Sequence, residues 1–181
     1  MKIDAHTNLL TSATYIPSPN HGDRSCNTID LLVIHGISLP PGEFGGDFIA
    51  QLFTNQLDPA VHPYFKEIAH LKVSSHVLIR RDGEVIQFVP FDKRAWHAGQ
   101  SEFQGRENCN DFSIGIELEG ADTVPYQPVQ HQKLVQLTNS IMQAYPAINQ
   151  DRIVGHSEIA PGRKTDPGQA FDWNYFRELL G

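Results

Sequence analysis

The chain has 181 residues, of which 40% are hydrophobic and 19% charged, a composition typical of one soluble globular domain. Acidic residues outnumber basic ones by 21 to 14, which gives a formal net charge of −7. This charge argues against sequence-independent binding to nucleic acid, because such binding depends on neutralising phosphates with basic side chains. It leaves the character of a small-molecule pocket open.

The N-terminal segment shows no export signal, because residues 1–20 contain no long apolar run followed by a small-residue cleavage site. No segment of the chain approaches the ~18 uninterrupted apolar residues of a membrane-spanning helix. We expect a cytoplasmic protein with no membrane association, in which Cys26 and Cys109 are reduced thiols. We expect one domain over residues 1–181, with residues 1–28 as a largely irregular N-terminal arm.

The first expected strand covers Asp30 to Gly36, where a continuous apolar run is typical of a strand buried on both faces. Asp47 can cap a helix with four apolar residues, which are Phe48, Ile49, Leu52 and Phe53. Residues 73–80 and 84–89 are rich in Val and Ile and flank an Asp-Gly pair. Asp-Gly between two such runs predicts a β-hairpin.

The segment from Phe112 to Glu119 alternates between apolar and polar residues, as a strand does. Its polar face carries Ser113, Gly115 and Glu117. Because Ser113 and Gly115 are small, we expect open space above this face of the sheet, in which a substrate can lie beside Glu117.

The last third of the chain predicts two helices and a strand. Pro128 can open a long helix that ends before Pro146, and a final helix is expected from about Asp172. Between them, residues 152–155 form a short expected strand that ends at His156. Strands and helices alternate, yet one hairpin is antiparallel, so we predict the α/β (α+β) class with a central mixed β-sheet flanked by helices.

Nine histidines are present, and most need no special role. Five are expected in loops or on helix surfaces, namely His6, His21, His62, His70 and His131. By contrast, His35 and His156 each end an apolar strand, where binding sites tend to form, and Asp166 follows ten residues after His156. Two histidines and a carboxylate suit zinc with a fourth position open to water, although this spacing is common by chance. From pattern alone, Glu117 also fits a solvent-facing glutamate and Lys164 an ordinary loop lysine.

Four longer motifs resemble the zinc amidases that cleave N-acetylmuramoyl-L-alanine bonds. In chain order they read LLVIHGISLPPGEFGGDFI, HVLIRRDGEVIQFVPFDKRAWHAG, GRENCNDFSIGIELEG and GHSEIAPGRKTDPGQAFDW. Within that family the chain is most similar to the cytoplasmic 1,6-anhydro-N-acetylmuramoyl-L-alanine amidases (AmpD-type). The resemblance implies the fold that these amidases share with peptidoglycan recognition proteins.

The resemblance also implies a role for each matching residue. His35, His156 and Asp166 correspond to the ligands of one zinc ion per chain, Glu117 to the catalytic base, and Lys164 to the positive group of the pocket. Related secreted amidases have cysteine where Asp166 stands, so the aspartate indicates the cytoplasmic branch.

Six further positions resemble substrate contacts, namely Gly36, Tyr64, Lys72, Trp96, His97 and Asn108. Three of these depart from the subfamily pattern, in which asparagine is usual at 36 and arginine is common at 72 and 108. Lysine lacks the planar two-pronged grip of arginine on a carboxylate, so Lys72 is expected to hold a stem-peptide carboxylate less tightly. For His97, a structural hydrogen bond is an equally good interpretation, and Trp96 is as well explained as a core residue.

The implied activity is hydrolysis of the amide bond between 1,6-anhydro-N-acetylmuramic acid and L-alanine in cytoplasmic muropeptides with tri- or tetrapeptide stems, during peptidoglycan recycling. No obligate protein partner is evident. Two alternatives remain, a muropeptide-binding module without activity and a lytic amidase of a phage or cell wall.

Overall fold

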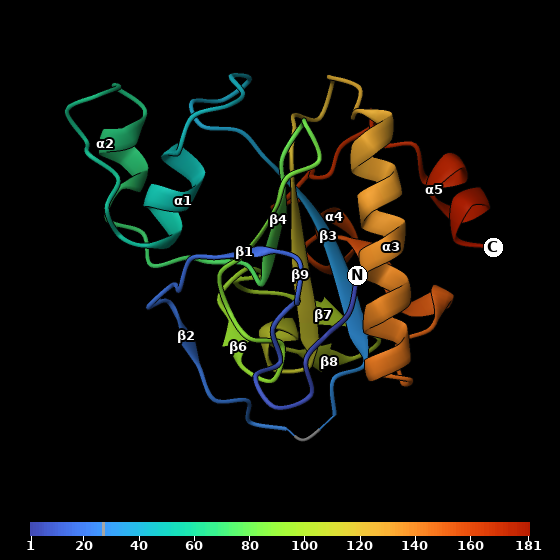
Figure 1. The fold of residues 1–181 in the computed structure, drawn as a ribbon. Coiled ribbons are helices and arrows are strands. Elements are labelled where there is room, and N and C mark those ends of the chain that lie inside the picture. The colour runs from blue at the N-terminus through green and yellow to red at the C-terminus, as the bar shows by residue number, and fades with distance from the viewer. Residues whose placement is uncertain (27) are drawn as a thin grey trace.

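The computed structural model describes residues 1–26 and 28–181 and has a six-stranded sheet at its centre (Figure 1). Across the sheet the strands follow in the order β1 (Thr14–Tyr15), β5 (Val85–Gln87), β4 (Val77–Ile79), β9 (Ser113–Glu119), β3 (Leu31–Ile37) and β10 (Ile153–Gly155). Within this sheet β4 and β5 are antiparallel, whereas the other neighbours are parallel. The predicted mixed sheet is therefore confirmed.

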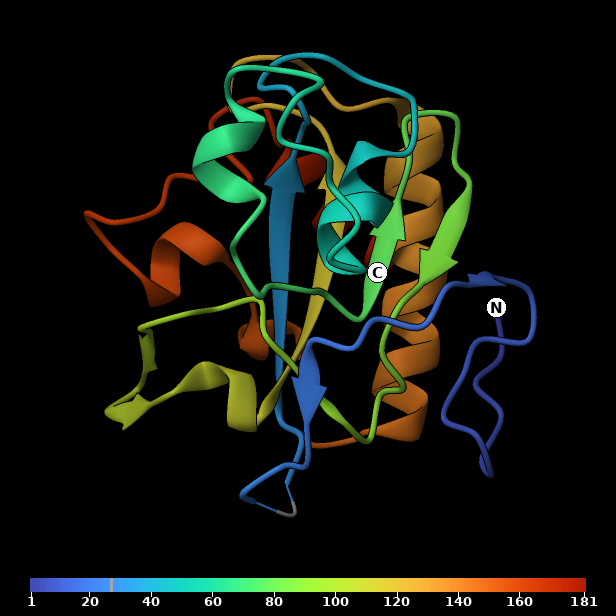
Figure 2. The ribbon, with the colours of Figure 1, turned by 90° about the vertical axis from the view of Figure 1, so that its left-hand side faces the viewer.

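Helices cover both faces of this sheet. Figure 2 shows α1 and α2 in front of the sheet and α3 behind it. The α-helices are α1 (Phe48–Phe53), α2 (Phe65–Ile68), α3 (Pro128–Ala144), α4 (His156–Ile159) and α5 (Trp173–Leu180), and the 3-10 helices are η1 (Cys109–Asp111) and η2 (Gln150–Arg152). Two small ribbons complete the fold, β2 (His21–Gly22) with β6 (Arg94–Ala95) and β7 (Glu102–Phe103) with β8 (Arg106–Glu107).

The main core fills the space between the sheet and α3. It contains apolar residues of β3, β9, α3 and α5, among them Leu32, Ile34, Ile114, Ile116, Leu118, Leu134, Leu137, Ile141 and Phe176. Successive side chains of a strand point to opposite faces, so the alternate residues of β3 and β9 face away from α3. His35 and Glu117 are among these alternate residues and lie beside one another in the register. The apolar core therefore directs the chemically active side chains to the opposite face of the sheet.

Sequence signals at the ends of the two long C-terminal helices act as expected. Gln127 and Gln130 exchange side-chain and backbone hydrogen bonds at the start of α3, and the helix ends at Ala144, before Pro146. Asp172 accepts a hydrogen bond from the backbone N–H of Tyr175 and so caps α5.

Two expectations about single residues are wrong. His131 does not lie on a helix surface but is buried, with its ring stacked on Phe171 at a centroid distance of 5.0 Å. Asp47 precedes α1 without a capping hydrogen bond from its side chain; instead, its Oδ1 lies 3.6 Å from Nη1 of Arg80. In both cases a partner distant in sequence decides where the side chain points.

The described part of the N-terminal arm is irregular apart from two short strands. Its β1 joins the central sheet parallel to β5, and its β2 pairs with β6. These strands have two residues each, which is too short for a periodic sequence signal. Pairing with strands that are distant in sequence therefore determines the position of the arm.

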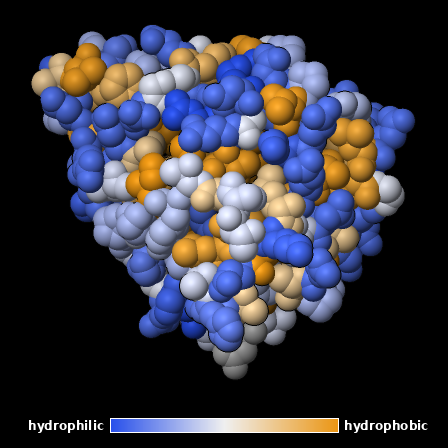
Figure 3. Space-filling model, viewed as in Figure 1, coloured by the Kyte–Doolittle hydropathy of each residue, from blue (hydrophilic) through white to orange (hydrophobic). Residues whose placement is uncertain are grey.

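The surface gives no indication of a membrane span among the described residues. No helix there is both long and apolar enough to cross a bilayer. Hydrophilic residues cover much of the face in Figure 3, with hydrophobic residues in separate patches.

Arg24 joins the arm to the body of the domain. Its Nη1 donates to the carbonyl oxygens of Asp111 and Ser113 at 3.1 and 3.0 Å, and its Nη2 donates to that of Phe91 at 3.0 Å. Burial lowers the pKa of its guanidinium to about 10, so the group stays charged at neutral pH.

We expect Arg24→Met to lower the free energy of unfolding by about 2–4 kcal/mol, because several partly buried carbonyl groups lose a charged donor. Urea unfolding measures this change. The matched control is Lys93→Met, which removes an exposed ion pair with Asp23 and is expected to change stability little. Equal effects of the two substitutions would contradict an anchoring role for Arg24.

Candidate metal and catalytic site

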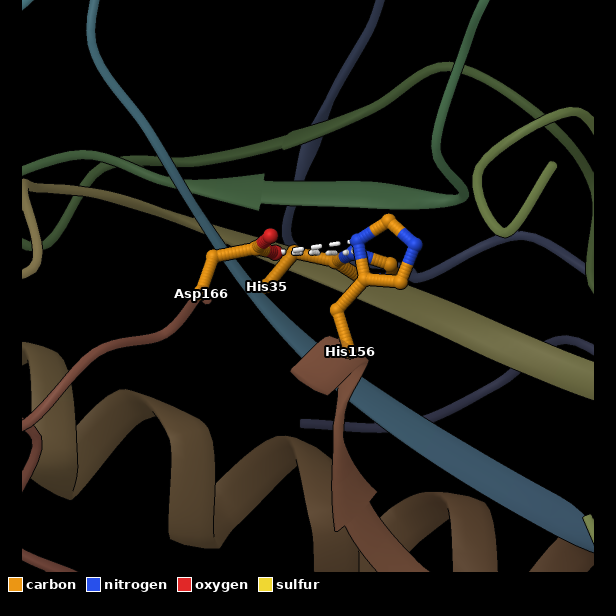
Figure 4. Close-up of side chains that lie close together, drawn as sticks. All are labelled: His35, His156 and Asp166. Carbon is orange, nitrogen blue, oxygen red and sulfur yellow. Dashed lines mark hydrogen bonds and ion pairs between the residues drawn. The ribbon is translucent and has the colours of Figure 1, made fainter. Parts of the chain in front are cut away.

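Three side chains from separate segments converge on one point (Figure 4). The two Nδ1 atoms of His35 and His156 are 2.9 Å apart. Oδ2 of Asp166 lies 3.1 Å from Nδ1 of His156 and 3.3 Å from Nδ1 of His35. The structure thus brings together the three residues that the sequence motifs assign as metal ligands.

The parallel pairing of β3 and β10 explains why the two histidines meet. Gly155 pairs with Ile34, so the next residues along the two strands, His156 and His35, lie at the same edge of the sheet. This is the carboxyl edge of the strands, where open α/β sheets form their sites. Asp166 reaches the same point from the loop after α4, which is fixed by a hydrogen bond from the backbone N–H of Ser157 to the Asp166 carbonyl at 3.0 Å.

The donor set fits zinc. Four ligands at about 2.0–2.2 Å in a tetrahedron lie roughly 3.3 Å from one another, close to the three separations observed here. Burial, the largest influence, lowers the pKa of His35 to about 4, which leaves its imidazole neutral, the form that binds metals. Burial alone would raise the pKa of Asp166, but its close contacts with the side chains of His156 and His35 outweigh burial, so this pKa falls below its usual range. Neutral imidazoles and an ionised carboxylate are the forms that a divalent cation requires.

Glu117 lies beside this cluster and is buried, with 8% of its surface exposed. It pairs with His35 in the β3–β9 register, and among the described residues its Oε2 has no hydrogen-bond partner. Burial and the nearby carboxylate of Asp166 raise its pKa well above the usual value, against the opposing charge of Lys164. A carboxyl group with a raised pKa and a free oxygen is suited to accept and release a proton. The alternative of a solvent-facing glutamate is wrong, because the side chain is buried at the wall of a pocket.

A pocket of about 550 Å³ opens next to the cluster. Its walls include many of the residues expected at the site, namely Gly36, Tyr64, Trp96, His97, Glu117, His156, Lys164 and Asp166. Lys72 is exposed and lies outside these walls, although its neighbours Leu71 and Val73 belong to them. Asn108 lines a separate pocket of about 400 Å³.

Arg163 belongs to the walls of both pockets and was not singled out from the sequence. Its Nη2 donates to the carbonyl oxygens of Ala98 and Gln100, each at 2.6 Å. Its position next to Lys164 in the GRKTDPG motif is the sequence feature that could have indicated a place in the pocket wall. The side chain therefore contributes to the walls of two neighbouring pockets.

The space expected above Gly115 is not open. The ring of His97 fills it, since a Cβ atom added at Gly115 would lie 2.5 Å from the ring carbon Cγ. The small residue therefore accommodates a buried imidazole rather than a substrate. Burial lowers the pKa of His97 well below its usual value, so this ring is neutral.

The packing of Tyr126 requires a residue without a side chain at position 36. A Cβ atom at this position would overlap the hydroxyl group of Tyr126, and a Cβ at Gly120 would overlap the ring of the same tyrosine. The Tyr126 hydroxyl donates to the Pro167 carbonyl at 2.9 Å, next to Asp166. Tyr126 thus needs two glycines to reach the loop that carries the third candidate ligand. No pattern in the sequence indicated this contact.

Comparisons with known proteins identify the family. The family model described as N-acetylmuramoyl-L-alanine amidase matches residues 25–169. Over 175 residues the chain is 61% identical to the 1,6-anhydro-N-acetylmuramyl-L-alanine amidase AmpD of Enterobacter cloacae, which covers 94% of this chain and 91% of that protein.

Two solved structures are also similar. The crystal structure of a selenomethionine derivative of AmpD has a TM-score of 0.96 and 57% identity, with 100% of both chains covered. The Escherichia coli amidase AmiD, in complex with the substrate anhydro-N-acetylmuramic acid-L-Ala-D-γ-Glu-L-Lys, has a TM-score of 0.62 and 30% identity. That match covers 94% of this chain and 60% of the AmiD chain.

We expect Gly36→Ala to lower the free energy of unfolding by about 1–3 kcal/mol, because the added methyl group must displace the buried Tyr126 hydroxyl. Urea unfolding measures the loss. Gly22→Ala is the control, since its added Cβ meets no atom closer than 3.5 Å. A Gly36→Ala protein as stable as the Gly22→Ala protein would show that Tyr126 relocates at no cost.

Proposed function

The chain belongs to the N-acetylmuramoyl-L-alanine amidase family, and on this basis we propose that it hydrolyses 1,6-anhydro-N-acetylmuramoyl peptides with one zinc ion held by His35, His156 and Asp166. The bond cleaved joins muramic acid to the L-alanine of the stem peptide. The observation that carries this proposal is the convergence of the three ligand atoms at the edge of a pocket that also contains Glu117.

The substrate class rests on the relatives and on the size of the pocket. The AmpD relatives are named as 1,6-anhydro-N-acetylmuramyl-L-alanine amidases, and AmiD is described with an anhydromuramoyl tripeptide as its substrate. A pocket of about 550 Å³ lies within the range of roughly 300–1,000 Å³ that small-molecule sites occupy. Muropeptides with tri- or tetrapeptide stems are the proposed substrates, with the stem continuing beyond the pocket.

Zinc, when bound, lowers the pKa of a water ligand to about 7 and polarises a carbonyl oxygen. Glu117 takes a proton from the water that attacks the carbonyl carbon of the muramoyl group. As the carbon–nitrogen bond breaks, Glu117 delivers that proton to the alanine nitrogen. The products are a muramic acid carboxylate and a peptide with a free amino group.

Lys164 stabilises the negative charge that develops on the carbonyl oxygen during attack. Its side chain belongs to the pocket wall, close enough to Glu117 and His35 to affect the pKa of each. Tyr64 and Trp96 are proposed to contact the sugar or the peptide, because their aromatic rings line the same pocket.

We place this activity in peptidoglycan recycling in the cytoplasm. The support is the aspartate at the third ligand position, which resembles the cytoplasmic branch of the family. We also propose that residues 1–181 act as one amidase domain, without nucleic acid, a membrane or an obligate protein partner.

Purified protein is expected to release free tripeptide from 1,6-anhydro-N-acetylmuramoyl tripeptide, as followed by mass spectrometry. Release should stop with a zinc chelator and return when zinc is added. No cleavage by folded, zinc-loaded protein would indicate a muropeptide-binding module instead. Rapid clearing of intact cell walls would indicate a lytic amidase.

Glu117→Gln is expected to keep zinc binding and to lower kcat by about 100-fold or more, because the amide cannot accept the proton. Zinc content by metal analysis and kcat on the same substrate are the two measurements. Glu158→Gln is the matched control, since its side-chain oxygen can still accept from the Gly155 N–H. Near-normal turnover by the Glu117→Gln protein would remove Glu117 from the role of base.

A further inference from the structure

His97 lies between a candidate metal ligand and a buried hydroxyl group. Its Nδ1 is 2.8 Å from Nε2 of His35, and its Nε2 is 3.1 Å from Oγ of Ser113. The Ser113 Oγ lies in turn 2.5 Å from the carbonyl oxygen of Cys109. All of these side chains are buried. The four groups form a continuous chain of hydrogen bonds that ends at the proposed zinc site.

The carbonyl group of Cys109, at the end of this series of hydrogen bonds, determines which atom donates in each of them. A carbonyl oxygen can only accept, so the hydroxyl of Ser113 donates its hydrogen to Cys109. The Ser113 oxygen is then an acceptor for an N–H on Nε2 of His97. A neutral imidazole has a single N–H, so Nδ1 of His97 is an acceptor.

The same argument gives the tautomer of His35. Because Nδ1 of His97 accepts, Nε2 of His35 carries the hydrogen and donates it. The remaining nitrogen of His35, Nδ1, then has a free lone pair, and this is the atom that faces Asp166 and His156. A metal ligand needs that lone pair.

The tautomers of His35 and His156 are determined in different ways. Nε2 of His156 lies 3.1 Å from the carbonyl oxygen of Ala98, which can only accept and therefore fixes the tautomer of His156 directly. His35 faces another imidazole, which can donate or accept. Its tautomer therefore depends on Ser113, one residue further away.

The ring of His97 is held rigidly in the position that this role requires. It packs on the backbone of Gly115 and meets the ring of His35 edge-on, at 88° and a centroid distance of 4.9 Å. The backbone N–H groups of His97 and Ala98 both donate to Oδ1 of Asn110, at 3.1 and 2.8 Å. With both ring nitrogens used inside the protein, His97 can offer a substrate only ring carbon atoms.

We propose that Ser113 and His97 are positioning residues that set the tautomer of His35, so that its Nδ1 is presented unprotonated to zinc. The use of this tautomer rests on the proposed zinc function. In the metal-free protein the carboxylate of Asp166, 3.3 Å from Nδ1 of His35, favours the opposite tautomer. A measurement without zinc therefore decides whether the His97 side or the Asp166 side sets the tautomer.

The first test is the ¹⁵N spectrum of the histidine side chains in metal-free wild-type protein. The two ring nitrogens of His35 are expected to show a protonated Nε2 and an unprotonated Nδ1. A protonated Nδ1 on His35 would overturn the proposal, whether or not the protein cleaves muropeptides. The expected tautomer in a protein that fails to bind zinc would overturn the proposed function and leave the tautomer assignment standing.

The second test removes the Ser113 hydroxyl, which determines the direction of the hydrogen bonds. Ser113→Ala is expected to give a mixture of His35 tautomers and to weaken zinc binding about 10- to 100-fold, as measured by competition with a chromophoric chelator. His97→Phe keeps a ring of similar shape but removes the acceptor, and it is expected to weaken zinc binding to a similar degree.

Ser75→Ala is the matched control. Ser75 is also a buried serine whose hydroxyl donates to a carbonyl oxygen, that of Gly115 at 2.8 Å, but it forms no hydrogen bond with His97 in the described structure. This variant should keep the His35 tautomer and a zinc Kd within about twofold of wild type. The proposal fails if folded Ser113→Ala and His97→Phe proteins behave like the Ser75→Ala protein in both measurements.

Discussion

The parallel pairing of β3 with β9 and β10 is the constraint on which the rest of the site depends. It sets His35 beside Glu117 and one step from His156, so the proposed base and two proposed metal ligands come from three adjacent strands, near their carboxyl ends. The apolar residues on the opposite face of β3 and β9 hold this register, because a slip of one residue would turn them away from α3. Packing on one side of the sheet therefore determines chemistry on the other.

Much of this arrangement could be predicted from the sequence, because long periodic segments carry their own signal. The apolar run before His35 and the alternation before Glu119 correspond to β3 and β9. The three candidate metal ligands were predicted from the family motifs and not from residue spacing, because only folding brings Asp166 close to the two histidines. Contacts between distant segments gave no such signal, as the burial of His131 against Phe171 and the packing of His97 on Gly115 show.

The buried polar groups around the site differ in how they are satisfied. Buried polar groups normally have hydrogen-bond partners, and those of Ser113, His97 and His76 do. Oε2 of Glu117 is left without one among the described residues. This oxygen faces the pocket and is free to bind a reacting water or a substrate.

The fit of Tyr126 between Gly36 and Gly120 also has an evolutionary consequence. A side chain at position 36, such as asparagine, must displace the hydroxyl end of the Tyr126 ring. The two positions are therefore epistatic: the order in which mutations arise decides which of them selection tolerates. A larger residue at position 36 is therefore expected to cost less in a chain in which the tyrosine at position 126 has already been replaced by a smaller residue.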